Sequence, residues 1–360
     1  MSETLRVRAY NVGLGDCILV TLPAGKERKH LLVDFGSTRG KDKAYLKAVC
    51  KDILEQVGDD PLAVFLSHGH MDHFKGLHNH LSELDAKTEV LLTTHHLRTA
   101  EAMRAGTRDG PVMSALDTVM KDLKSRLKSE KSDEETRALA EDRDETDRML
   151  DELCKELGDR VRYLARGAHQ VLAPFLRGTG AKIEILAPER DNTAYTERTF
   201  SKLLTAPERR SIGRGLILDM IRERIKSRVA LKDLLMAERE YDNSTSLVFS
   251  LEWKGKLLLF PGDAELPSWE VMHEKGVLRP VDLLKVAHHA SPNGTPVAMP
   301  EVWKSLIDKA RKPRFLVSTY PRKDWGMPDP GILSRLGQEG QVISTEDVRG
   351  TPGFVDVLVS

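Results

Sequence analysis

Three histidines and an aspartate follow an apolar run within one short stretch of the chain. The run, residues 62–66 (LAVFL), predicts a buried strand, and residues 67–73 (SHGHMDH) begin directly after it. On such a tight loop, His68 and His70 can point one way while Asp72 and His73 point the other. Because imidazole and carboxylate groups suit zinc, manganese and iron, the stretch predicts a site for two metal ions side by side.

The alternative is a histidine-rich surface loop, for which composition alone is the argument. The whole chain has 12 histidines in 360 residues, so three of them within six residues favour the metal site.

The overall composition is typical of a soluble globular protein, with 40% hydrophobic and 31% charged residues. Lys+Arg and Asp+Glu both number 55, so the formal net charge gives no argument for a polyanionic partner, although a local basic patch is compatible with it. Cys17, Cys50 and Cys154 are far apart and odd in number, which predicts reduced thiols in a cytoplasmic protein. We expect no signal peptide and no membrane span.

Short apolar runs continue on both sides of the histidine stretch, and helices are expected at residues 41–57 and 74–84. The other expected strands are residues 5–10, 17–22, 30–34, 89–94, 160–164, 170–172, 182–186, 246–253, 257–260, 281–287, 315–320, 341–345 and 354–358. Several of these strands end in polar, ligand-type residues, so we expect their ends to meet at one rim. Neither a linker nor a short repeat divides the chain, and we expect a single domain over residues 1–360.

Two helical insertions are expected within this domain. Residues 97–160 are highly charged and predict a solvated pair of helices. Residues 190–240 are basic, and two interpretations stay open for them: a solvated amphipathic helix, or a helix that contacts phosphate near the active site. The basic side chains are Arg214, Arg222, Arg224, Lys226, Arg228 and Lys232.

Residues 68–73, followed by Gly262-Asp263 and then His288, resemble the metallo-β-lactamase superfamily. More narrowly, the chain is similar to the hydrolase domain of bacterial competence DNA-uptake proteins (the ComEC type), over nearly its whole length apart from the two insertions. The segments that carry this narrower resemblance are residues 11–16 (NVGLGD), 243–248 (NSTSLV), 284–291 (LKVAHHAS), 318–320 (STY) and 326–328 (GMP). The resemblance implies an α/β fold, an αββα sandwich of two mixed sheets with helices outside and metals at one edge.

The resemblance also implies a role for each matching residue. His68 and His70 match ligands of the first of two divalent metal ions, for which zinc is the first choice and manganese the alternative. Asp72, His73 and His288 match ligands of the second ion. Asp263 matches the carboxylate that bridges both ions.

One feature departs from many superfamily members, which place a further histidine on the first metal before the bridging aspartate. Residues 186–190 (LAPER) contain no histidine. His95, His96 and His169 are candidates by order only, and we expect them not to be ligands. The competence-type proteins often lack this histidine too, and its absence leaves the first site poor in ligands.

A hydroxide that bridges the two metals would attack a phosphorus or carbonyl centre, with Asp72 or Asp263 orienting it. Lys285 either stabilises a phosphate oxygen or is an ordinary surface lysine. His289 and Ser291 are expected to contact the substrate's leaving group or to support His288. Asn243 is a further candidate for substrate binding.

The leading functional hypothesis is a phosphodiesterase or nuclease, from the narrower resemblance and the basic residues 214–232. The second is a hydrolase of a small amide, ester or lactone. The third is a non-catalytic effector or binding module that keeps its metal for structure, against which the open His/Asp pattern argues. The sequence leaves the native metal, the exact substrate, the oligomeric state and the biological system open.

Overall fold

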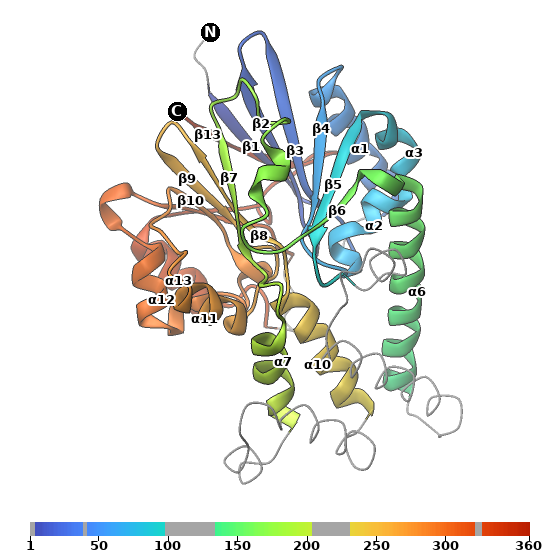
Figure 1. Ribbon diagram of the computed structural model, residues 1–360, viewed down its shortest axis with the longest axis vertical. Helices are drawn as coiled ribbons and strands as arrows, with labels where there is room; N and C mark the ends of the chain where they lie inside the picture. The colour runs from blue at the N-terminus through green and yellow to red at the C-terminus, as the bar shows by residue number, and fades with distance from the viewer. Residues whose placement is uncertain (1–3, 39–41, 98–133, 204–230, 321–325) are drawn as a thin grey trace.

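The computed structural model describes residues 4–38, 42–97, 134–203, 231–320 and 326–360. Two mixed β-sheets pack face to face, and helices cover the outer face of each sheet (Figure 1). This is the αββα sandwich of the metallo-β-lactamase fold, so the predicted fold class is confirmed.

Within the described residues, the first sheet has seven strands in the order β13-β1-β2-β3-β4-β5-β6. Their bounds are β1 Leu5–Tyr10, β2 Cys17–Ala24, β3 Glu27–Phe35, β4 Leu62–Leu66, β5 Thr88–Thr94, β6 Val161–Leu164 and β13 Phe354–Val359. The strands β3 to β6 run parallel, while β13, β1, β2 and β3 pair in antiparallel fashion. The carboxyl ends of the parallel strands therefore lie at one edge of the sheet.

The second sheet has six described strands in the order β12-β11-β10-β9-β8-β7. Their bounds are β7 Lys182–Ala187, β8 Val248–Trp253, β9 Lys256–Phe260, β10 Leu283–Lys285, β11 Arg314–Val317 and β12 Gln341–Ser344. The strands β9 to β12 are parallel, so their carboxyl ends also share one edge.

Alternating side chains of both sheets fill the space between them. Phe65 of β4 stacks on Phe249 of β8 with ring centroids 4.2 Å apart, and Phe249 stacks on Phe260 at 5.0 Å. All three are part of one continuous buried cluster that includes residues of both sheets. This shared core fixes the two sheets relative to each other.

The outer faces are covered by two groups of helices. The bounds on the first sheet are α1 Lys43–Val57, α2 Met71–Asn79, α3 Leu81–Leu84 and α6 Glu134–Leu157; on the second sheet they are α11 Leu266–Glu274, α12 Pro300–Leu306 and α13 Pro330–Glu339. The helices α7 Thr193–Phe200 and α10 Leu231–Ser244 extend from one end of the sandwich (Figure 1). The described 3₁₀ helices are η1 Asp85–Lys87, η2 Gly158–Arg160, η3 His169–Leu172, η4 Ser201–Leu203, η5 Ala287–Ala290, η6 Pro296–Ala298 and η7 Lys309–Arg311.

Two predicted elements differ from the structure. The strand expected at residues 170–172 is wrong: η3 occupies this position, because the chain crosses here from β6 in one sheet to β7 in the other. Leu172 is buried in the core while Val171 is exposed, so the apolar residues serve a turn and not a ladder. The helix expected at residues 74–84 begins earlier, at Met71, and is divided into α2 and α3 at His80.

The described part of the first insertion, from residue 134 onward, is less solvated than expected. The last turns of α6 bury Met149, Leu150, Leu153, Cys154 and Leu157 in the same core cluster as α1 and α2. An added Cβ on Gly69 would lie only 2.9 Å from Leu150 Cδ1, so α6 packs directly against the histidine loop.

Most of the basic stretch of the second insertion lies outside the described residues, including Arg214, Arg222, Arg224, Lys226 and Arg228. Lys232, in α10, lies within them, and its Nζ is 2.6 Å from Glu135 Oε2 of α6. The described end of this stretch therefore contacts the other insertion.

None of the described helices combines the length and the apolar character needed to cross a bilayer.

Candidate metal centre

The histidine loop connects β4 to α2 at the rim where parallel strands end. His70 is the N-cap of α2, with extended backbone angles, and Asp72 lies in the first turn, where the helix dipole favours a carboxylate. His68 Nε2 and His70 Nδ1 lie 3.0 Å apart, within hydrogen-bond distance of each other. The rings of His68 and His73 have centroids 4.2 Å apart, which places two groups of candidate ligands side by side.

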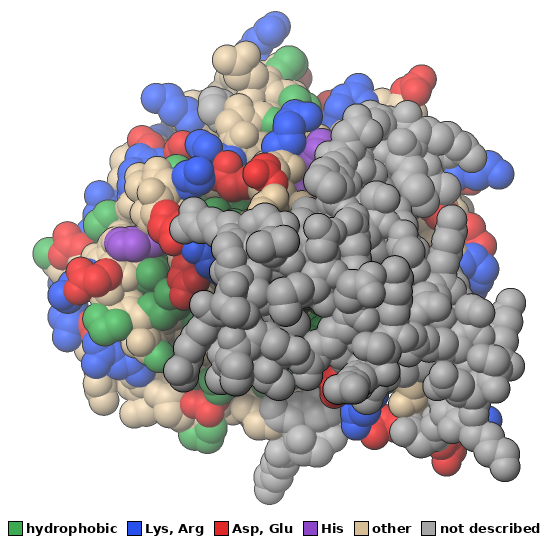
Figure 2. Space-filling view, turned by 60° about the horizontal axis from the view of Figure 1, so that its bottom comes forward, with side chains coloured by type: hydrophobic (Ala, Val, Ile, Leu, Met, Phe, Trp, Pro, Cys, Tyr) green, Lys and Arg blue, Asp and Glu red, His purple; other side chains and the backbone are tan. Residues whose placement is uncertain are grey.

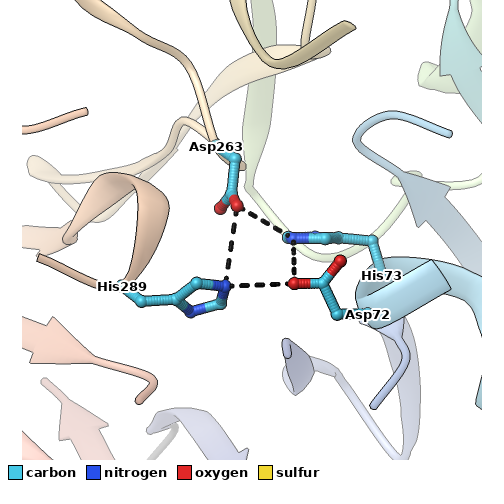
Figure 3. Close-up of side chains that lie close together, drawn as sticks. All are labelled: Asp72, His73, Asp263 and His289. Carbon is cyan, nitrogen blue, oxygen red and sulfur yellow. Dashed lines mark ion pairs between the residues drawn. The ribbon is translucent and has the colours of Figure 1, made fainter. Parts of the chain in front are cut away.

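Four residues from three segments form one compact group at this rim (Figure 3). We call Asp72, His73, Asp263 and His289 the rim cluster; one ligand atom from each lies within 4.8 Å of all the others. His73 Nε2 is 3.1 Å from Asp263 Oδ2, and His289 Nε2 is 3.5 Å from Asp72 Oδ2 and 3.6 Å from Asp263 Oδ2. The predicted convergence of strand ends at one rim is confirmed for these four residues.

The structure distinguishes between the two adjacent histidines at positions 288 and 289. His288 was predicted to be a metal ligand together with Asp263, but it lies outside the rim cluster. His289 was predicted to contact the substrate, and it lies within the cluster. The physical reason is the backbone: His288, His289 and Ala290 have φ values of 47°, 54° and 63°. Three consecutive non-glycine residues in this left-handed region form a strained turn, of a kind concentrated at functional sites. This turn directs the His289 ring, and not the His288 ring, into the cluster.

Hydrogen bonds fix the orientation of both imidazoles of the rim cluster. His289 Nδ1 lies 2.9 Å from the buried carbonyl oxygen of Ser318. Because a carbonyl only accepts, Nδ1 donates and the lone pair on Nε2 faces the cluster. His73 Nδ1 lies 2.8 Å from Asp34 Oδ2, which orients the His73 ring in the same way.

The residues present fit a divalent cation. The Nε2 atoms of His73 and His289 are buried, and neither has a hydrogen-bond partner within the described ranges. Buried polar atoms are normally paired, so two unpartnered nitrogens that face two carboxylates are the donor set of a cation site. The mixture of imidazole and carboxylate suits zinc or manganese but does not choose between them.

Electrostatics maintain the charges that such a site needs. Burial raises the pKa of the Asp72 and Asp263 carboxyls, but the neighbouring His73 and His289 outweigh it and lower both below their ordinary values. Burial likewise lowers the pKa of His73 and His289, but the carboxylates, led by Asp263, outweigh it and raise both. A cation and a proton therefore compete for the same nitrogens, and metal binding releases protons.

The pair formed by His68 and His70 is different, because burial dominates there. Burial and the nearby His73 lower the pKa of His68, and burial together with Arg239 lowers the pKa of His70 to about 3. Both rings are therefore neutral at physiological pH, and of the two facing nitrogens, His68 Nε2 and His70 Nδ1, one donates and the other accepts their hydrogen bond. His70 Nε2 faces Asp242 Oδ2 at 3.9 Å, and Asp242 also accepts a hydrogen bond from Arg143 of α6.

Asp34 at the end of β3 is a supporting residue that the sequence analysis missed. It is buried, has a φ of 56°, and accepts hydrogen bonds from Ser67 N at 2.7 Å and Ser67 Oγ at 2.8 Å in addition to its contact with His73. Its position in the sequence could have identified it, because Asp34, like the candidate ligands, is a polar residue at the end of an apolar strand.

Lys285 is buried, so the interpretation as an ordinary surface lysine is wrong. Its Nζ forms an ion pair with Asp16, lies 3.4 Å from Asp263 Oδ1, and donates to the carbonyl oxygen of Gly262 at 3.0 Å. Burial lowers the pKa of Lys285, but Asp16 and Asp263 outweigh it and raise the pKa, so the ammonium stays charged. Asp16, a second residue that the sequence analysis did not select, forms with Asp34 and His73 another group of potential ligands.

The segment of residues 11–16 supports the histidine loop through its backbone. Asp16 N donates to the carbonyl oxygen of Asp72 at 3.1 Å. An added Cβ on Gly15 or on Gly36 would overlap the Asp72 backbone, so only glycine permits this approach. The function of the NVGLGD segment is thus to position the start of α2.

A cavity of about 1540 Å³ opens over the rim cluster, and Asp72, Asp263 and His289 line it. Asn243 and Ser291, predicted to bind substrate, also line it; Asn243 Nδ2 donates to Glu265 Oε1 at 2.8 Å, and Ser291 Oγ accepts from Gly294 N. Helices α6, α7 and α10 provide a large part of the described wall. Figure 2 shows basic and acidic side chains intermixed at this end of the molecule.

Of the three histidines considered by order alone, His95 and His96 lie outside the rim cluster. His96 Nε2 lies 2.7 Å from the carbonyl oxygen of Glu189, and His95 stacks edge-on against His96 with centroids 5.3 Å apart. His169 begins η3, at the crossing between the sheets.

Residues 10–148 match the family model of the Metallo-beta-lactamase superfamily. The match includes the histidine loop and ends before Asp263 and His289, which the tertiary structure adds to the site. No curated protein matches the chain. The narrower resemblance to competence DNA-uptake proteins therefore stays a prediction.

Proposed function

We propose that this protein is a metal-dependent hydrolase that cleaves phosphodiesters with two divalent metal ions. The observation that carries the proposal is the rim cluster, where His73 and His289 direct unpartnered nitrogens at two carboxylates beneath an open cavity. The superfamily match over residues 10–148 supports hydrolytic, metal-dependent chemistry. The choice of a phosphodiester rests on the sequence resemblance and on the two adjacent groups of ligands.

Under this proposal, His68 and His70 would hold the first ion once the proton between their facing nitrogens is released, and Asp72, His73 and His289 would hold the second. Asp263 contributes to both, since it lies beside His73 and acts electrostatically on His68. When bound, such a pair of ions acts as a Lewis acid and lowers the pKa of water, and it suits the in-line displacement at phosphorus.

The other residues of the site hold this arrangement in place. Asp34 and the Ser318 carbonyl keep the His73 and His289 rings oriented. Lys285 balances the charge of Asp16 and Asp263 from the side away from the cavity, where it does not contact the substrate. Asp72 and Asp263 line the cavity as ionised carboxylates and accept hydrogen bonds that orient the attacking water.

Cys17, Cys50 and Cys154 are buried as thiols. This agrees with a reducing compartment, and we propose a cytoplasmic location.

A second candidate is hydrolysis of a small amide, ester or lactone, and the charge of the cavity wall favours it. The described wall includes Glu135, Asp142, Glu145, Asp233 and Glu240. Three basic residues of the same wall are already engaged: Arg239 with Asp142, Lys202 with Glu240, and Lys75 with Glu145 at 3.9 Å. Such a wall gives little attraction to a polyanion and so disfavours long nucleic acids more than small substrates.

The test compares substrates on protein purified without chelator and supplied with zinc or manganese. Bis(p-nitrophenyl) phosphate, single-stranded DNA, duplex DNA and RNA test the first proposal, and p-nitrophenyl acetate and a homoserine lactone test the second. Metal-dependent cleavage of a phosphodiester that the Asp263→Ala variant abolishes supports the first. Cleavage of the acetate or the lactone alone replaces it with the second.

A further inference from the structure

A group of buried polar atoms lies beside the rim cluster and is not explained by metal binding. Asn243 at the end of α10, Glu265 before α11 and His288 of η5 all line the cavity. Asn243 and Glu265 are only 5% and 2% exposed. Asn243 Oδ1, Glu265 Oε2 and His288 Nδ1 are buried and have no hydrogen-bond partner among residues 4–38, 42–97, 134–203, 231–320 and 326–360.

The orientation of Asn243 follows from its contact with Glu265. Asn243 Nδ2 donates to Glu265 Oε1 at 2.8 Å. Burial raises the pKa of Glu265 to about 7, and in its ionised form the carboxylate offers acceptors only. The carbonyl oxygen Oδ1 is then the free end of the amide. Two acceptors, Asn243 Oδ1 and Glu265 Oε2, are therefore left without a donor at the cavity wall.

His288 connects these acceptors to the rim cluster. Its Nδ1 is 3.5 Å from Glu265 Oε1, and its Nε2 is 4.0 Å from Asp263 Oδ2. A substrate whose scissile bond lies at the rim cluster thus places its neighbouring group near Asn243 and Glu265.

We propose that Asn243, Glu265 and His288 form a subsite that accepts hydrogen bonds from the substrate. It binds a hydroxyl or ammonium group of the substrate next to the scissile bond. The inference rests on the proposed hydrolytic function and deepens it by naming a substrate class. Unpaired buried acceptors impose a large desolvation cost, and a ligand donor removes that cost. The same acceptors disfavour a second phosphate or a carboxylate at this position.

The kinetic test uses propyl, 3-hydroxypropyl and 3-aminopropyl p-nitrophenyl phosphate, which differ only at the terminal group. We expect kcat/KM to be at least about tenfold higher for one donor-bearing ester than for the propyl ester, as for a hydrogen bond to a charged group. The hydroxypropyl and aminopropyl arms show which donor is preferred.

Variants assign this preference to the subsite. In Glu265→Leu the ratio of donor-bearing to propyl ester should fall to about 1, and Glu265→Gln, which keeps one acceptor, should retain part of it. Glu145→Leu is the matched control, since it removes a cavity carboxylate on α6 and should keep the parent ratio. Equal ratios in the parent and Glu265→Leu overturn the inference.

A binding test separates this inference from the proposed function. Calorimetry of the zinc-loaded protein with propyl, 3-hydroxypropyl and 3-aminopropyl phosphate should show tighter binding of a donor-bearing ligand, lost in Glu265→Leu. This result supports the subsite even if no phosphodiester is cleaved, which would end only the proposed function. Equal affinities overturn the subsite. Loss of zinc from Glu265→Leu, measured by elemental analysis, also overturns it, because the residue would then belong to the metal centre.

Discussion

Two groups of carboxylates meet at His73, and they differ in what neutralises them. In the rim cluster, Asp72 and Asp263 face imidazole nitrogens that have no hydrogen-bond partner among the described residues. In the other group, which we call the inner cluster, Asp16 and Asp34 lie beside the same His73.

The protein itself supplies donors and a positive charge to the inner cluster, except at Asp16 Oδ1, which has no hydrogen-bond partner among the described residues. Lys285 forms an ion pair with Asp16, while Ser67 donates twice to Asp34. The comparison shows that ligand-type residues alone do not define a metal site. Lys285 pairs with Asp16 and also lies 3.4 Å from Asp263 Oδ1, so the lysine does not distinguish the two clusters. The difference is that the rim cluster places two imidazole nitrogens without hydrogen-bond partners, among the described residues, at its carboxylates.

The largest effect is expected from removing the carboxylate that the rim cluster shares. Asp263→Ala should lose metal and lower hydrolysis by more than the roughly 100-fold that loss of an outer partner costs. The reason is that Asp263 lies within reach of both His73 and His289. Elemental analysis and turnover of bis(p-nitrophenyl) phosphate measure the two losses. If the variant keeps full metal content and activity, every metal-dependent mechanism at this site is contradicted.

A loss of stability is expected when the inner cluster loses its internal cation. Lys285→Met leaves the buried Asp16 carboxylate without its ion-pair partner, which should lower the free energy of unfolding by about 3–5 kcal/mol. The double variant Lys285→Met/Asp16→Asn should recover part of this loss, because the uncompensated charge is gone. Urea denaturation of the metal-free proteins measures both. Equal stability of Lys285→Met and the parent would contradict the internal-cation interpretation.

A smaller effect is expected at the junction between the two clusters. Asp34→Asn keeps the shape of the side chain but weakens the contact that orients His73, and it should lower metal affinity by about 10–100-fold. Asparagine also tolerates the positive φ at this position, so the backbone should be retained. Competition with a chromogenic chelator measures the affinity. An unchanged affinity would mean that Asp34 serves folding alone.

The smallest effect concerns a histidine outside both clusters. Burial is the main cause that lowers the pKa of His96 from 6.5 to about 4, so the folded protein keeps it neutral while the unfolded chain binds a proton below 6.5. Stability from this residue is therefore present above pH 6.5 and is lost as the pH falls toward 4. Between pH 7 and 5.5 the loss is about 1 kcal/mol.

The His96→Gln variant should show a correspondingly smaller decrease in unfolding free energy over the same pH range, measured in urea on metal-free protein. If the parent and the variant respond identically to pH, His96 is not held neutral by the fold.

The family resemblance predicted the fold class, and the apolar pattern predicted most of the strands because alternating burial leaves a direct trace in the sequence. It also selected Asp72, His73 and Asp263, since each follows an apolar strand. It did not select Asp16, Asp34 or Glu265, because single carboxylates near the ends of strands are common and their partners are distant in the chain. Residues of the 3₁₀ helix η3 were predicted as a strand for a related reason. A short apolar run does not reveal whether it pairs within a sheet or crosses from one sheet to the other.

The sequence by itself determined that histidines and carboxylates follow buried strands, and hence that a candidate metal site lies at a sheet edge. Only the tertiary structure decided which of His288 and His289 enters the rim cluster, through three consecutive left-handed residues. It also decided that Lys285 is buried against Asp16 instead of exposed. The physical reason is that neutralisation of a buried charge depends on groups brought together across both sheets, and local patterns record strands and turns but not these pairings.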